Sequence, residues 1–194
     1  MAAEAYARLT NRPAVVCVTS GPGATNAITG VAGAWMDSIP MLVLSGQVRY
    51  ATSTYASGLP LRTRGVQEFD IIGSVQNMTK YCKVISDPAE IRYCLEKAIF
   101  LALDGRPGPC WLDIPLDVQA AWIDSETLEG YKPEIVDRSI APEIITSIMQ
   151  KIIESKRPVI FCGNGVRLAG AHDAFLQLVN ILKIPVVTGM SSID

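Results

Sequence analysis

The residues best suited to hold a ligand lie at positions 19–26, a run of small side chains in which two glycines flank a proline. The run follows an apolar stretch at 14–18 and precedes a helical pattern, so it predicts a tight turn between a buried strand and a helix. Gly21 and Gly23 can adopt backbone angles closed to other residues, and Pro22 stiffens the turn between them. Turns of this kind lie at the carboxyl edge of a parallel sheet, where α/β proteins bind ligands.

The strand before this turn and a second run at 40–46 are continuous apolar stretches rather than alternating ones. That pattern favours a parallel sheet with helices on both faces, so we expect an α/β fold. The helix after the turn is predicted over 27–36, with Thr25 or Asn26 as its N-cap. Its many small residues suit close packing against a sheet.

The rest of the first domain continues the alternation of strands and helices. Residues 47–66 form a long polar connection, and connections of this length in a compact domain are usually functional or mobile. The other expected elements are a short helix at 66–72, a weak strand near 81–85, a helix at 87–104 and a strand at 110–115. The first domain is therefore predicted to span 1–119.

Composition changes after the first domain. Residues 120–141 lack a clear period and are interpreted as a surface linker, and a second α/β unit is predicted at 142–194. Its expected elements are a helix at 142–155, a strand at 157–162, a helix at 169–182 and a strand from 184. This is the start of a Rossmann-like domain and too little to close a core by itself. We therefore expect that the chain is truncated there or that a partner surface is missing.

Charge and composition narrow the classes of function. The net charge is −2 with no basic block, which argues against nucleic acid, since phosphate neutralisation needs clustered Lys and Arg. No window approaches the roughly 20 apolar residues of a membrane span, and the start of the chain lacks the pattern of a signal peptide. We therefore expect a cytoplasmic protein with neither nucleic-acid nor membrane partners.

The cysteines and the single histidine do not suggest a metal site. Cys17 and the four other cysteines are scattered and mostly lie in apolar runs, so we interpret them as reduced thiols of the core. His172 lies in a plain helical pattern, which indicates a surface position rather than a Ser-His-Asp triad or a metal ligand. No metal-ligating residue is predicted in this chain.

Several short motifs occur in the order found in one known family. They are Thr-Ser-Gly-Pro-Gly-Ala-Thr-Asn at 19–26, Asp-Ser-Ile-Pro at 37–40, Gln-Glu at 67–68, Thr-Lys at 79–80, Arg-Pro-Gly-Pro at 106–109 and Leu-Asp-Ile-Pro-Leu-Asp-Val-Gln at 112–119. Together they resemble the N-terminal, pyrimidine-binding domain of thiamine diphosphate-dependent enzymes, with the acetolactate synthase branch as the nearest match. Residues 142–194 resemble the start of that family's central domain.

The resemblance implies a carboligase that acts on 2-oxo acids such as pyruvate, a transferase of branched-chain amino acid biosynthesis. In that family thiamine diphosphate attacks the keto carbon, carbon dioxide leaves, and the remaining acyl unit joins a second acceptor, giving acetolactate in this branch. Mg²⁺ and the diphosphate are held by a C-terminal domain, FAD is a further cofactor of some members, and the enzymes are homodimers or tetramers. A 2-oxo acid decarboxylase or another acyltransferase of the family is the first alternative.

The resemblance also assigns roles to residues of the first domain. Gly21, Pro22, Gly23 and Asn26 would line the pyrimidine side of the cofactor, and Gln67 would face the reacting centre. The alternative for the first four residues is an ordinary tight turn with a helix cap.

Other assignments lie farther along the chain. Lys80 resembles a lysine near the substrate entrance or the flavin, and the alternative is a solvated charge at a helix end. Gly163 and Gly165 would approach a flavin or nucleotide in the central domain, although many relatives keep that fold without a nucleotide. Asp113 and Asp117, near the end of a strand, are interpreted as structural.

The chain departs from the family pattern in several places. The family's activating glutamate lies roughly two helical turns before the position of Glu4. The catalytic role therefore does not pass to Glu4, and the family's first strand is expected before that helix as well. The Gly-Asp-Gly…Asn motif for the metal and diphosphate does not occur in 1–194, and Val66 stands where the family often has an aromatic residue.

These departures leave two hypotheses of other classes open. One is a catalytically inactive fragment that acts only as a binding or dimerisation module. The other is a generic nucleotide-binding α/β domain that uses the Gly-Asn-Gly turn at 163–165, a weak signal because such turns are common.

Overall fold

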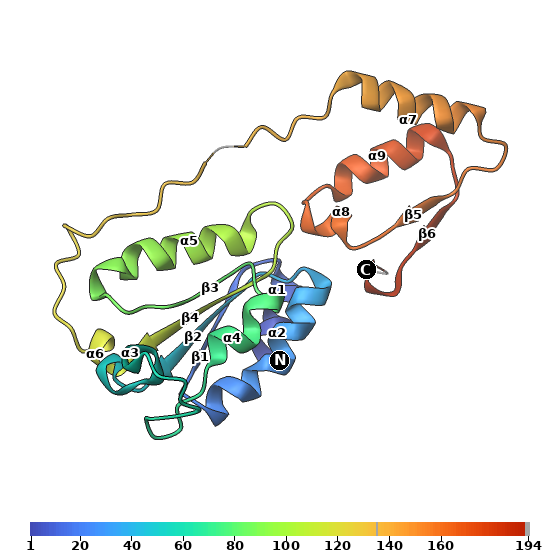
Figure 1. The fold of residues 1–194 in the computed structure, drawn as a ribbon. Helices are drawn as coiled ribbons and strands as arrows, with labels where there is room; N and C mark the ends of the chain where they lie inside the picture. The colour runs from blue at the N-terminus through green and yellow to red at the C-terminus, as the bar shows by residue number, and fades with distance from the viewer. Residues whose placement is uncertain (135, 193–194) are drawn as a thin grey trace. The chain divides into compact units, whose positions relative to one another are not determined.

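A computed structural model describes residues 1–134 and 136–192, and the chain divides into two compact units, Met1–Glu134 and Ile135–Asp194 (Figure 1). The α-helices and strands of the first unit are α1 (Ala2–Thr10), β1 (Ala14–Val18), α2 (Pro22–Asp37), β2 (Met41–Gln47), α3 (Thr54–Ser57), α4 (Ile71–Val75), β3 (Tyr81–Val84), α5 (Ile91–Leu103), β4 (Pro109–Pro115) and α6 (Leu116–Gln119). Short 3-10 helices are η1 (Tyr50–Thr52), η2 (Gln76–Met78) and η3 (Pro88–Glu90).

The strands of the first unit form one parallel sheet in the order β1-β2-β4-β3. Its register places Val16 beside Val43, and Val43 beside Trp111. The central strands β2 and β4 are buried at almost every residue, as expected for strands covered on both faces. The predicted α/β fold with a parallel sheet is confirmed.

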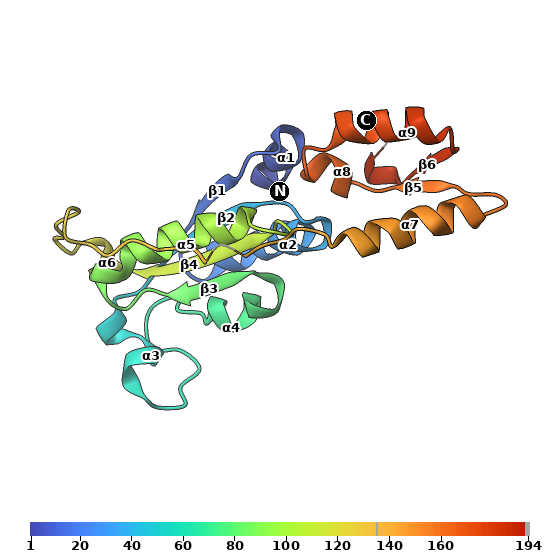
Figure 2. The ribbon, with the colours of Figure 1, turned by 90° about the horizontal axis from the view of Figure 1, so that it is seen from above.

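Helices cover both faces of this sheet (Figures 1 and 2). On one face α1, α2 and α4 pack around Val31, Val43 and Trp111, which are fully buried. On the other face α5 packs its buried Cys94 and its neighbours against Leu112. Successive strand residues point to opposite faces, so adjacent residues of β4 enter different cores.

Helix α2 begins at Pro22, earlier than predicted. Gly21 is its N-cap residue, so the prediction that Thr25 or Asn26 caps the helix is wrong. Proline suits the first helical position because its missing N–H would have no partner there and its φ already fits the helix. Thr25 and Asn26 therefore lie within the helix.

The short helix predicted at 66–72 is displaced, because α4 starts only at Ile71. Its N-cap is Asp70, whose Oδ1 accepts a hydrogen bond of 2.9 Å from the backbone N of Gly73. Gln67 lies in a turn and has a φ of 59°, in the left-handed region. A residue in that region does not continue a right-handed helix, so the helix cannot include Gln67 and begins after it.

The interpretation of the cysteines as core thiols is wrong for Cys17, which is exposed. β1 is an edge strand, and α5 packs chiefly on the other three strands (Figure 2). Val15, on the same face of β1 as Cys17, is 59% exposed. The apolar run of this strand therefore does not imply burial on both faces.

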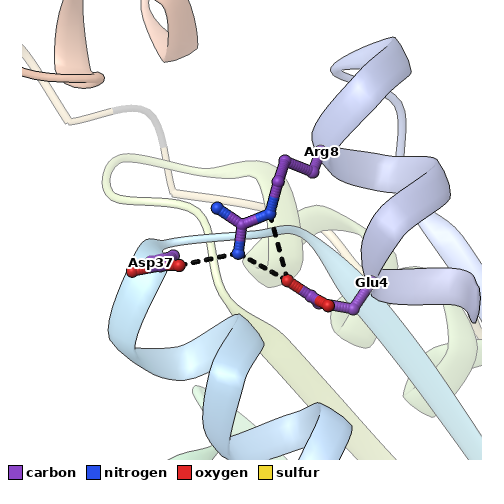
Figure 3. A network of polar contacts seen from close by, with 3 residues as sticks. All are labelled: Glu4, Arg8 and Asp37. Carbon is purple, nitrogen blue, oxygen red and sulfur yellow. Dashed lines mark hydrogen bonds and ion pairs between the residues drawn. The ribbon is translucent and has the colours of Figure 1, made fainter. Parts of the chain in front are cut away.

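Helix α1 lies along α2. The Nη2 of Arg8 donates to Glu4 at 2.5 Å and to Asp37 of α2 at 2.6 Å (Figure 3). At the other end of α1, a Cβ on Gly30 would lie 2.6 Å from the backbone N of Met1. In both contacts the residue of α2 comes 29 positions after its partner in the sequence. The two helices therefore run side by side in the same direction.

Replacing Arg8 with alanine should lower the free energy of unfolding by only about 0.5–1 kcal/mol, because the guanidinium and its two carboxylates are partly exposed. Urea unfolding at low salt and at about 1 M salt, where the screening length is about 3 Å, measures the effect. The difference from wild type should shrink at high salt. A loss of several kcal/mol that salt does not change would contradict a surface ion pair.

The second unit contains α7 (Pro142–Glu154), β5 (Ile160–Cys162), α8 (Gly165–Leu168), α9 (His172–Leu182), β6 (Val186–Thr188) and the 3-10 helix η4 (Met190–Ser192). β5 and β6 pair in parallel, which confirms the predicted start of a second Rossmann-like unit. The strand predicted at 157–162 begins later than expected, after Pro158, which lacks a backbone N–H. His172 is 65% exposed at the start of α9, as predicted for a surface residue.

The first part of the predicted linker packs on α5. The backbone N of Tyr131 donates to Glu96 at 2.7 Å, and Arg92 donates to the carbonyl oxygen of Leu128 at 3.2 Å. No helix or strand occurs at 121–134 or 136–141. Across the described parts of the chain, no helix is both long and apolar enough to span a membrane.

Candidate functional site

The turn after β1 meets the loop that carries Gln67. Gly21 has a φ of 56°, and a Cβ there would overlap the carbonyl oxygen of Gln67 and lie 3.2 Å from the Gln67 Cβ. Gln67 itself has a positive φ, which is uncommon for a residue with a side chain and often marks a functional site. The fold therefore brings together the predicted cofactor-binding turn and the predicted catalytic glutamine.

Glu68 holds this loop in place through hydrogen bonds to its carboxylate. Its buried carboxylate accepts two hydrogen bonds from Thr54, at 2.6 and 2.7 Å. It accepts two more, both of 2.8 Å, from the backbone N atoms of Arg64 and Gly65. Burial by itself would raise the pKa of Glu68, but the hydrogen bonds from Gly65 and Thr54 outweigh it and lower the pKa. The ionised side chain of Glu68 thus holds the loop in place directly beside Gln67.

A cleft of about 710 Å³ opens at the carboxyl ends of β1, β2 and β4. Residues 17–20 and 44–48 line it, together with Ile114, Leu116 and Gln119. Its volume is in the range of small-molecule sites, and its place in the sheet is where α/β proteins bind ligands. The lining includes Thr19 and Ser20, so the cleft adjoins the turn at Gly21.

The other predicted cofactor residues lie at the start of α2. Pro22 and Asn26 are exposed, and Gly23 is half-buried. A Cβ at Gly23 would lie 2.7 Å from the Cγ2 of Thr19, so a larger residue there would press on the turn. These residues therefore offer an accessible backbone and one amide side chain beside Gly21.

A buried hydrogen-bond network underlies the same edge of the sheet. Trp111 Nε1 donates to Ser45 Oγ at 2.8 Å, and Ser45 Oγ donates to Asp113 Oδ1 at 2.5 Å. Gln47 Nε2 donates to Asp113 Oδ2 at 2.9 Å and to the carbonyl oxygen of Phe69 at 3.1 Å. Burial raises the pKa of Asp113 to about 6, although the hydrogen bonds from Ser45 and Gln47 oppose that shift. The network joins the strand ends to the loop that carries Gln67.

The sequence analysis missed Ser45 and Gln47 as parts of the site. Their position at the end of a buried apolar run was the available signal, because polar residues there face the carboxyl edge of the sheet. The structural interpretation of Asp113 and Asp117 agrees with their contacts. Asp117 Oδ1 accepts a hydrogen bond of 2.9 Å from the backbone N of Tyr50, at the start of the loop.

Lys80 lies away from this site. It precedes β3, so it is at the amino edge of the parallel sheet, whereas Gly21 and Gln67 are at the carboxyl edge. Its Nζ donates to the carbonyl oxygen of Asp104 at 2.5 Å. Lys80 also lines a cavity of about 340 Å³ with Trp35, Met36, Arg106 and Pro107. The first unit therefore does not bring Lys80 and Gln67 together.

In the second unit, Gly163 directly follows β5, and Gly165 is the first residue of α8. Within the described residues, and apart from the adjoining backbone, no atom lies within 4 Å of a Cβ placed on either glycine. A cavity of about 260 Å³ is lined by residues 162–164, 166 and 167 with His172, Phe175, Thr188 and Ser192. The Oγ of Ser192 is buried and has no hydrogen-bond partner within the described part of the chain.

Metal coordination finds no support in the described residues. Within 1–134 and 136–192, no group of three His, Cys, Asp or Glu side chains is arranged to hold a metal ion.

Two family models match successive parts of the sequence. "Thiamine pyrophosphate enzyme, N-terminal TPP binding domain" matches residues 1–74, and "Thiamine pyrophosphate enzyme, central domain" matches 145–193. The chain belongs to the thiamine pyrophosphate enzyme family. The N-terminal match includes the turn at Gly21, the whole of α2 and the loop with Gln67.

Curated relatives point to one branch of the thiamine pyrophosphate enzymes. The chain is 36% identical to the acetolactate synthase isozyme 3 large subunit of Escherichia coli and 40% identical to the acetolactate synthase large subunit of Corynebacterium glutamicum. It is 39% identical to the probable acetolactate synthase large subunit of Methanocaldococcus jannaschii. These alignments cover 96–99% of this chain and 30–32% of the relatives, so the chain spans about a third of their length.

Proposed function

We propose that the chain forms part of a thiamine diphosphate-dependent 2-oxo acid carboligase of the acetolactate synthase type. The observation that carries the proposal is the contact between Gly21 and Gln67, at the carboxyl edge of the sheet and inside the segment that matches the N-terminal binding domain. The names of the curated relatives support the acetolactate synthase branch. Pyruvate is the proposed substrate, and branched-chain amino acid biosynthesis is the proposed role.

The residues at this edge fit the pyrimidine part of the cofactor. When bound, thiamine diphosphate supplies a nucleophilic carbon that adds to a keto group and takes up the electrons released with carbon dioxide. Gly23 is half-buried and Pro22 and Asn26 are exposed, so a ring could approach the start of α2 beside the Gly21 turn. The exposed side chain of Gln67 would orient the substrate from the adjoining loop.

The packing of α1 on α2 supports the same placement. In the family the activating glutamate lies roughly two turns before the position of Glu4. If α1 were continued backwards by about two turns at the same offset of 29 residues, that position would lie level with Asn26 on α2. The family's glutamate position and the predicted pyrimidine-side residues would thus face one another.

Other features of the proposed enzyme concern its second cofactor and assembly. FAD is proposed near Gly163 and Gly165, where the space around the glycines suits a ligand and the Ser192 hydroxyl has no partner among the described residues. Because Lys80 lies at the opposite edge of the sheet from Gln67, it is proposed to lie near the flavin and not near the substrate. Mg²⁺ would be held by the family's Gly-Asp-Gly…Asn motif, which residues 1–194 do not contain. We further propose a cytoplasmic homodimer or tetramer.

Two alternatives compete with the proposed carboligase. A decarboxylase or another acyltransferase of the same family would use the same pyrimidine site. An inactive binding or dimerisation module is the second alternative; the chain spans about a third of the length of its curated relatives.

Calorimetric titration of the 194-residue chain with thiamine and with thiamine diphosphate tests the proposal. We expect both ligands to bind with similar affinity, because the residues at the cleft are proposed to contact the pyrimidine side and not the diphosphate. We expect no release of carbon dioxide from pyruvate by this polypeptide alone, even with thiamine diphosphate and magnesium ion. If neither ligand bound, the proposed pyrimidine site would be contradicted. Turnover of pyruvate above background would contradict the expectation that this polypeptide supplies only the pyrimidine side of the site.

A further inference from the structure

The buried network around Asp113 has a defined direction of donation. The indole N–H of Trp111 can only donate, so Ser45 Oγ accepts it and directs its own hydrogen to Asp113 Oδ1. Gln47 donates to the other carboxylate oxygen. Both oxygens of Asp113 therefore accept hydrogen bonds, as those of an ionised carboxylate do. The side chain of Asp113 is fully buried, so water does not replace these donors.

Gln47 connects this carboxylate to the loop. Its Oε1 accepts a hydrogen bond of 3.0 Å from the backbone N of Val48, which fixes the orientation of the amide. Its Nε2 then has two hydrogens, one for Asp113 and one for the carbonyl oxygen of Phe69. Since Phe69 is two residues from Gln67, the amide of Gln47 tethers the site loop to the sheet.

We propose that Asp113 is a positioning residue of the cofactor site: its carboxylate orients Gln47, and Gln47 holds Phe69 so that Gln67 stays against Gly21. The inference rests on the proposed function, since it takes Gln67 and Gly21 as parts of one site. Asp113 does not line the cleft and acts only through Gln47.

The chemistry of Asp113 supports a role beyond joining two strands. Burial disfavours its charged form and raises its pKa to about 6, and the charge of Asp70 adds to that shift. A well-packed apolar side chain between β2 and β4 is often as stabilising as a buried charged group, or more so. The carboxylate provides a strong acceptor for one N–H of the Gln47 amide. The other N–H of that amide then donates to the loop at Phe69.

Hydrogen–deuterium exchange with mass spectrometry of the folded chain tests this role. The amide of Glu68 donates to Gly65, and that of Ile71 to Phe69, so a peptide covering 65–72 reports opening of the loop. In Gln47→Met, which keeps the size but loses the amide, this peptide should exchange about tenfold faster than in wild type. Asp113→Ala should give a similar acceleration, and the double variant no further one, because both changes break one tether.

Two variants serve as controls. Ser45→Ala removes the hydrogen bond on the far side of Asp113 and should leave exchange of the 65–72 peptide within about twofold of wild type. Asp113→Asn keeps one acceptor oxygen for Gln47 and should restore most of the protection lost in Asp113→Ala. Wild-type exchange in Gln47→Met would overturn the proposal. So would equal acceleration in Ser45→Ala, which would indicate general loosening of the sheet edge. If Asp113→Ala does not fold, Gln47→Met and Ser45→Ala still decide whether the Gln47 tether holds the loop.

Titration of the same variants with thiamine diphosphate separates this inference from the proposed function. If wild type binds the ligand, Gln47→Met should weaken binding about tenfold, and Asp113→Asn, which keeps an acceptor for Gln47 and lies outside the cleft lining, should weaken it less. If wild type binds neither thiamine nor thiamine diphosphate, the proposed function fails. The exchange of the loop peptide would still decide whether Asp113 positions Gln67.

Discussion

Replacing Gly21 with alanine should lower the free energy of unfolding by about 3 kcal/mol and abolish binding of thiamine. The backbone of Gly21, with φ of 56° and ψ of −116°, lies outside the regions that residues with a side chain occupy. The added Cβ would also overlap the carbonyl oxygen of Gln67. The strain is relieved only if the turn and the Gln67 loop move apart, so both stability and the site suffer. Chemical denaturation and calorimetric titration measure the two effects.

Gly33→Ala is the matched control for this substitution. Gly33 lies in helix α2, and outside the helix's own backbone no atom of the described residues lies within 4 Å of a Cβ placed there. Alanine is the better helix former, so Gly33→Ala should leave stability unchanged or raise it by up to about 1 kcal/mol, with normal binding. If Gly21→Ala matched Gly33→Ala in both measurements, the contact with Gln67 would not be needed for the site.

Replacing Glu68 with alanine should lower the free energy of unfolding by about 3 kcal/mol and release the loop before α4. The carboxylate accepts four hydrogen bonds, from Thr54, Arg64 and Gly65, and alanine leaves all four donors without this partner. Hydrogen exchange of the 65–72 peptide should rise toward that of an unstructured segment, while a peptide from α5 stays protected. An unchanged loop would show that Glu68 does not hold it.

The pH dependence of stability gives a second test of Glu68. Its pKa in the folded chain lies below the ordinary value of 4.5, because hydrogen bonds to the carboxylate outweigh burial. The unfolded chain therefore takes up the proton first as the pH falls. The stabilisation is complete above pH 4.5 and is lost as the pH falls through the folded pKa. In Glu68→Gln the difference from wild type should accordingly be largest near neutral pH and disappear in acid.

The strands of the first unit could be predicted because buried strands consist of consecutive apolar residues, which are visible in the local sequence. The apolar runs predicted at 14–18, 40–46 and 110–115 correspond to β1, β2 and β4 within a residue at either end. A parallel strand covered on both faces needs apolar residues at every position, so no tertiary information is required to find it. The exposed Cys17 shows the limit of this signal, because the same run can form an edge strand.

The loop between β2 and α4 could not be predicted in the same way. Its conformation depends on side chains that bond the backbone, chiefly those of Glu68, Asp117 and Gln47. Such hydrogen bonds join residues far apart in the sequence and leave no periodic pattern. The helix predicted at 66–72 was therefore wrong, and the positive φ of Gln67 was not foreseen.

By itself the sequence determined the class of the fold, the order of its elements and, through motifs in order, the thiamine pyrophosphate enzyme family. It also singled out Gly21, because glycines around a proline after a buried strand mark a close approach of the backbone. Only the tertiary structure decided what approaches Gly21 within the chain, namely the Gln67 loop, and how Gln47 and Asp113 tether that loop to the sheet. The reason is physical: a local pattern records burial and backbone freedom, whereas a contact between distant residues exists only once the sheet has aligned the ends of its strands.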